Sequence, residues 1–130
     1  MSAASNYLED AVLDHVLGNT QYSPVANLYL GLWTADDGLE AGTLTSEVSG
    51  GSYAREIITF DASSGGTADS ASTVTFTTAT ANWGTITHVA IMDAASGGNV
   101  LFHGAVTTSK TIETGDTFQV SAGNLTITLA

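Results

Sequence analysis

Short runs of alternating apolar and hydroxyl residues, separated by glycine-rich turns, set the strongest limit on how this chain folds. Residues 72–79 alternate most clearly, with Val74 and Phe76 on one side of a strand and threonines on the other. About seven such runs follow Pro24 along the chain. Short strands at this spacing predict a mainly β fold, either a β-sandwich or a small barrel, over residues 25–130.

The segment before these strands has a different pattern. Residues 5–17 space their apolar side chains as a helix does, Ser5 or Asn6 can cap the first turn, and Gly18 is a natural stop. A helix of about 13 residues is marginal alone in water. We therefore expect it to pack on the chain's own sheet or on a neighbouring subunit. Residues 1–130 are expected to form one domain.

The chain is strongly acidic, which limits the kinds of molecule that it can bind. The sequence has 13 acidic residues against Arg55 and Lys110, a formal net charge of −11. Such a chain repels nucleic acid and anionic membranes, and no segment approaches the roughly 20 apolar residues of a membrane helix. Cysteine is absent, which excludes disulfides and thiolate metal sites. The many threonines suit protein–protein contact, although threonine is also simply a good strand residue.

One short segment comes close to a catalytic motif. Residues 50–54, GGSYA, resemble the nucleophile elbow G-x-S-x-G, but Ala54 stands where the last glycine belongs. Ser52 would also open a strand instead of lying between a strand and a helix. No glycine-rich phosphate loop occurs, and nothing indicates a glycosidase pair of carboxylates. We expect a protein without enzymatic activity or cofactor.

An acidic loop is the first candidate metal site. Asp36, Asp37 and Glu40 lie in a long loop over residues 34–51 and supply oxygen ligands of the kind that calcium prefers. Their spacing is not that of an EF-hand. The prediction is a solvated acidic loop without a metal.

Two histidines are the second candidate. His88 and His103 lie on the two arms of a hairpin predicted over residues 86–106. If Met92 pairs with Val100, regular alternation places the two imidazoles on opposite faces of the hairpin. A shared metal ion is therefore not expected.

Four aromatic residues are candidates for stacking on a sugar. They are Tyr29, Trp33, Tyr53 and Trp83. Trp83 lies next to a turn, and we expect it to be the most exposed of them. The commoner alternative is that such aromatics fill the core.

Longer segments resemble a known group of proteins. The strings SNYLEDAVLDHVLG, LYLGLWTAD, EVSGGSYARE and ANWGTITHVAIMDAASGGNVLFHGAVTTSKTI occur in this order along the chain. They resemble small virion proteins of tailed bacteriophages, often described as tail fibre or structural proteins. The resemblance extends from Ser5 to the final residues. It implies a mainly β virion component with no enzymatic activity and no catalytic residue to place.

The resemblance leaves two positions in the virion. An acidic protein fits an exterior position, where its charge limits aggregation. The preferred expectation is a capsid decoration (cement) protein that binds the major capsid protein on the outer surface. The alternative is a tail fibre or tail-tip component that binds host surface glycan. In both cases we expect a homo-oligomer, with a trimer as the expected form.

Arg55 stands out as one of two cations in an acidic chain. It follows a glycine pair and can form a bidentate pair with Glu47, with Asp61, or with an acid of another subunit. An intrachain clamp is the preferred interpretation. The alternative is an interface role, and the residues considered for an interface are Arg55, Tyr53, Trp83 and Trp33.

Overall fold

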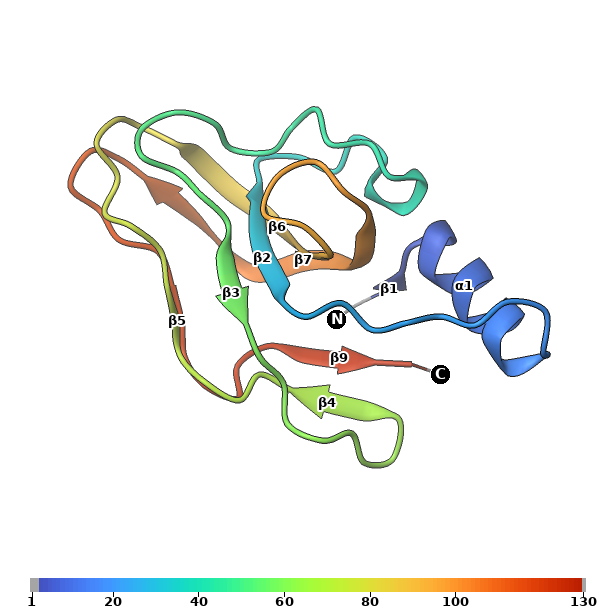
Figure 1. The fold of residues 1–130 in the computed structure, drawn as a ribbon. Coiled ribbons are helices and arrows are strands. Elements are labelled where there is room, and N and C mark those ends of the chain that lie inside the picture. Colours follow the sequence, from blue (N-terminus) through green and yellow to red (C-terminus); the bar gives the residue numbers. More distant parts are fainter. Residues whose placement is uncertain (1–2, 130) are drawn as a thin grey trace.

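The computed structural model describes residues 3–129, and its main element is a five-stranded antiparallel sheet (Figure 1). The strands lie in the order β1-β7-β6-β2-β3. Their bounds are β1 (Ala3–Ala4), β7 (Val100–Ile112), β6 (Gly84–Met92), β2 (Leu28–Trp33) and β3 (Glu56–Ile58). Two short ladders complete the strands: β4 (Thr67–Asp69) with β9 (Thr126–Thr128), and β5 (Val74–Thr75) with β8 (Gln119–Val120). The helix is α1 (Asn6–Val16), and a single 3₁₀ turn is η1 (Leu39–Ala41).

The main core lies between the five-stranded sheet and the two ladders. Leu30 and Ile91 enter it from the sheet, and Phe76, Phe118 and Leu125 enter it from the opposite layer. The chain is therefore a mainly β protein of two packed layers with one helix, as the sequence predicted. The sandwich is the better of the two architectures named above, because the strands described form no closed barrel.

A smaller core covers the other face of the sheet. Along β2, Leu30 and Leu32 point into the main core, whereas Trp33 points into a second cluster with Met92 and Val100. Leu39, on η1, covers this second cluster from the loop over residues 34–49. The strand β2 is apolar on both faces because it has an apolar layer on each side.

Helix α1 begins where the sequence predicted. The N–H of Leu8 donates to the side-chain oxygen of Ser5 over 3.2 Å, and the Ser5 hydroxyl in turn donates to the carbonyl of Val100. The backbone N–H of Ser5 donates to the carbonyl of Leu101 over 2.9 Å, so the cap is held on β7. Leu8 is buried against the sheet. The helix therefore docks on its own chain through its first turn.

The hairpin of β6 and β7 contains a bulge that overturns the prediction for the two histidines. Met92 pairs with Val100 as expected, but Ile91 pairs with Phe102, which leaves Leu101 as an extra residue. One extra residue reverses the facing of everything beyond it. His103 consequently lies opposite Ala90, on the same face as His88, and the expectation of opposite faces is wrong.

Other differences from the prediction concern strand bounds: β7 runs to Ile112, beyond the hairpin predicted over residues 86–106, and only Val74–Thr75 of residues 72–79 is a strand. The short strands β3 and β4 were not delimited from the sequence. The two-residue strand β1 was not expected. Each of these strands is defined by a partner far away in the sequence, which local spacing does not reveal. No helix within residues 3–129 is long and apolar enough to cross a membrane.

Candidate interaction surfaces

Arg55 is held by a bidentate ion pair inside the chain. Its Nε and Nη2 donate to Oε2 and Oε1 of Glu47, each over 2.7 Å. Its Nη1 donates to the carbonyls of Ala94 and Gly97 over 2.8 and 2.9 Å. The side chain of Arg55 is 2% exposed. The preferred interpretation is confirmed: Arg55 clamps the acidic loop to the hairpin loop of residues 93–99, with Glu47 and not Asp61 as its partner.

Tyr53 extends this clamp into the sheet. Its hydroxyl donates to Oε2 of Glu47 over 2.8 Å and accepts the N–H of Leu32 over 3.0 Å. Burial is the main cause that raises the pKa of Tyr53 far above its ordinary value, and the charge of Glu47 adds to it. Burial opposes the charge of Arg55, but the hydrogen bond and charge of Glu47 outweigh it and raise the Arg55 pKa. The network is a charge-neutral anchor that is largely shielded from solvent.

Trp83 lies inside the protein, so the expectation that it is exposed is wrong. It is 5% exposed, packs edge-on against Tyr53 and Phe76, and donates from its indole nitrogen to the carbonyl of Gly51 over 2.9 Å. A Cβ on Gly51 would lie 2.8 Å from that nitrogen, and the φ angle of Gly51 is +58°. The glycine turn thus closes directly over the ring, which its position beside a turn did not reveal.

Trp33 is also unavailable at the surface. It is 1% exposed in the second core, and the guanidinium carbon of Arg55 lies 6.0 Å from its ring centroid. Three of the four interface candidates, Arg55, Trp33 and Trp83, are therefore buried within the chain, and Tyr53 is half-buried. In this fold they belong to the core and to the clamp beneath the surface.

Ser52 lacks the surroundings of a catalytic nucleophile. Its hydroxyl is paired with that of Thr80 over 2.9 Å, and its φ angle is +66°. A nucleophilic serine needs a hydrogen-bonded base. Among the residues that the structure describes, no histidine or carboxylate is hydrogen-bonded to Ser52.

The carboxylates of the acidic loop are used to shape that loop. Asp36 accepts the backbone N–H groups of Leu39 and Gly38, each over 3.0 Å, and these bonds lower its pKa. Glu40 pairs with Nε2 of His103 over 2.7 Å. Within residues 3–129, no three His, Asp or Glu side chains gather closely enough to hold a metal ion. Asp36 and Glu40 therefore act as a local cap and a contact to the sheet.

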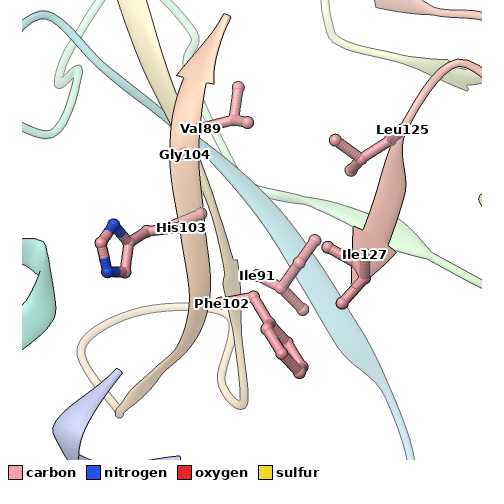
Figure 2. A pocket seen from close by; sticks show the side chains of 8 residues that line it. Val89, Ile91, Phe102, His103, Gly104, Leu125 and Ile127 are labelled. Carbon is pink, nitrogen blue, oxygen red and sulfur yellow. The ribbon is translucent and has the colours of Figure 1, made fainter. Parts of the chain in front are cut away.

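The gap between the sheet and β9 is too small for a ligand. Figure 2 shows Ile91 and Phe102 on one wall and Leu125 and Ile127 on the other, with His103 turned away on the far side of β7. The cavity holds only about 10 Å³, close to the volume that one water requires. This gap belongs to the packed core.

The exposed apolar surface lies instead around helix α1. Leu13 is 56% exposed, Leu17 is 70% exposed, and Leu129, beyond β9, is 55% exposed. A groove of about 570 Å³ opens between the helix and Leu129. Sequence analysis missed it, although apolar residues around more than one face of α1 were a signal. Contiguous exposed apolar side chains of this kind mark protein–protein contact.

Comparison with known proteins gives one family. The model of the family described as Podophage GP4 fiber I protein gp80 matches residues 3–128. No curated protein matches the chain. The match covers both layers of the fold and helix α1.

Proposed function

The chain belongs to the Podophage GP4 fiber I protein gp80 family, and on this premise we propose that it is a non-enzymatic structural component of the phage tail fibre. A virion location follows from membership of a fibre family. The description of the family favours the tail, the alternative named from the sequence, over the capsid surface that was preferred there. The family match over residues 3–128 is the observation that carries the proposal.

The non-enzymatic role is supported by how the polar side chains are used. Arg55, Glu47 and Tyr53 satisfy one another in a buried anchor, and Ser52 pairs with a threonine. Catalytic groups in contrast keep a reactive atom directed at an accessible cavity. The groove beside α1 is lined mainly by apolar side chains and offers contact area without such a group.

Glycan binding through the tryptophans is not part of the proposal. A sugar stacks on an exposed aromatic face, and Trp33 and Trp83 are 1% and 5% exposed. We place the chain's role in the assembly of the fibre, with protein partners.

Self-association remains part of the proposal, with a trimer as the expected form. The exposed threonines support it. Thr78 pairs with Thr117 over 2.8 Å and Thr85 pairs with Thr111 over 2.9 Å, which leaves a preformed hydroxyl surface. Contact through neutral side chains avoids the repulsion between copies that each carry a net charge of −11. Light scattering of the purified chain measures the number of copies, and a single monomeric species would contradict this part.

Counting copies in purified virions tests the tail location. Quantitative mass spectrometry should find a few copies per particle, as tail symmetry allows, and antibody labelling should mark the tail. Hundreds of copies with label over the head would overturn the proposal in favour of capsid decoration.

A further inference from the structure

The groove between helix α1 and the end of β9 is an apolar hollow that no side chain of the described residues fills. Leu8 and Val12 form its helical wall, Ala4 lies at its base, and Leu129 forms the opposite wall. Figure 1 shows β9 running toward the side of the molecule where α1 lies, beside the sheet edge at β1. The groove volume of about 570 Å³ is large enough for several side chains of a partner.

The apolar surface continues beyond this groove. Leu129 also lines a second hollow of about 310 Å³, whose other walls include Phe60, Phe102 and Ile127. On the helix side, Leu13 at 56% and Leu17 at 70% exposure extend the surface. Single exposed apolar residues need no explanation, but a continuous set around two hollows does.

Charge around the groove is of one sign. Helix α1 carries Glu9, Asp10 and Asp14, and Glu9 lines the groove itself. A partner whose cations face these carboxylates gains attraction, whereas a partner with acids there is repelled.

A second copy of the chain has almost no cation to offer. Of its two cations, Arg55 is buried and paired with Glu47. The other, Lys110, lies on β7 opposite Ile86 of β6, seven residues along the strand from His103 at the β1 edge. Seven residues of strand span roughly 20 Å. A second copy whose own helix lay along α1 would instead bring three further acids to it.

We propose that this groove holds a segment of a different virion protein, one with apolar side chains flanked by lysine or arginine. The apolar side chains fill the hollows on both sides of Leu129. One cation faces Glu9 in the groove, and the others lie toward the acidic helix α1, whose Asp10 and Asp14 line a separate hollow beside Tyr7 and Tyr22. The inference rests on the proposed function, because a fibre component must be joined to another protein of the tail.

Photo-crosslinking in the assembled virion tests the occupant. Leu13 is replaced by photoreactive benzoylphenylalanine, with Ser96, exposed in the hairpin loop, replaced in the same way as the matched control. Irradiation should join the position 13 variant, and not the control, to a Lys- or Arg-containing segment of another virion protein. A crosslink to a second copy, to an acidic segment, or to nothing would overturn the inference.

A binding assay with a defined probe tests the chemistry. The probe is a fluorescent peptide of about 14 residues, four helical turns, with leucines on one face and lysines on the other. The double variant Leu13→Ser and Leu129→Ser should weaken binding by about tenfold or more. Val25→Ser, an exposed apolar control outside the groove, should leave binding unchanged.

The charge requirement is tested with the same probe. The triple variant Glu9→Gln, Asp10→Asn and Asp14→Asn should weaken binding by about tenfold and flatten its dependence on salt. A peptide with glutamates in place of lysines should not bind. Equal binding of both peptides, or no effect of the triple variant, would overturn the inference.

These results separate the inference from the proposed function. Label over the head together with a crosslink to a basic segment would defeat the tail location and uphold the groove. Label on the tail together with a crosslink to a second copy would uphold the tail location and defeat the proposal for the groove.

Discussion

The Arg55 clamp buries charged side chains, whereas the α1–β9 groove exposes apolar ones, within one small protein. In the clamp, charged side chains are buried, and Glu47 and two carbonyls satisfy every nitrogen of the guanidinium. In the groove, Leu13 and Leu129 face solvent. The charged atoms of the clamp find their partners within the chain, whereas the apolar side chains of the groove remain exposed.

This difference separates stability from assembly. A buried pair such as Arg55 and Glu47 is costly to break, because either partner alone is an uncompensated buried charge. An exposed leucine such as Leu13 adds less to folding than a buried one, because more than half of its surface stays exposed in the folded chain. Mutations in the clamp should therefore act on the free energy of unfolding, and mutations in the groove should act on contacts between proteins.

The largest effect is expected from Glu47→Ala. Loss of the carboxylate leaves the Arg55 cation buried without a counter-ion, so the free energy of unfolding should fall by about 3–5 kcal/mol. Urea unfolding measures it. The control is Asp61→Ala, the other acid considered for this pair, which is exposed and should change stability by less than about 0.5 kcal/mol. Equal losses of stability in the two variants would contradict the assignment of Glu47 as the partner of Arg55.

A smaller loss is expected from Tyr53→Phe. The ring keeps its contacts with Trp83 and Phe76, but the N–H of Leu32 loses its acceptor. An unsatisfied buried donor costs about 1–3 kcal/mol, which thermal or urea unfolding detects. Tyr7→Phe, at a 45% exposed residue, is the matched control and should have almost no effect. If Tyr53→Phe leaves the free energy of unfolding unchanged, the hydroxyl is not part of the anchor.

On helix α1, Leu13→Ala should change stability by less than about 0.5 kcal/mol. Its matched control is Leu8→Ala on the same helix, where a 6% exposed side chain is lost and about 2–5 kcal/mol is expected. Unfolding curves of the two variants compare a buried and an exposed leucine of the same helix directly. A large loss from Leu13→Ala would mean that the chain itself covers this surface, and it would contradict the contrast drawn above.

The smallest effect concerns acid pH. Hydrogen bonds from the N–H groups of Leu39 and Gly38 lower the pKa of Asp36, so the folded chain releases this proton more readily than the unfolded chain. The stabilisation is present above the unfolded value of about 3.9 and is lost as pH falls through the lower folded pKa. Asp36→Asn should reduce the dependence of stability on pH in this window, as measured by urea unfolding at several pH values. Identical curves for the two proteins would contradict the cap.

The sequence by itself determined the features that depend on near neighbours. The start of the helix at Ser5 or Asn6 and the hairpin over residues 86–106 were both predicted, because each is set by side chains a few residues apart. The choice of a mainly β fold followed from the same periodicity.

Only the tertiary structure decided which side chains are buried and which long-range partners meet. The extra residue Leu101 turned His103 to the face of His88, and the turn at Gly51 covered Trp83. The groove has walls from both ends of the chain. Burial depends on what the rest of the chain places next to a residue, and spacing along the sequence carries no measure of that distance.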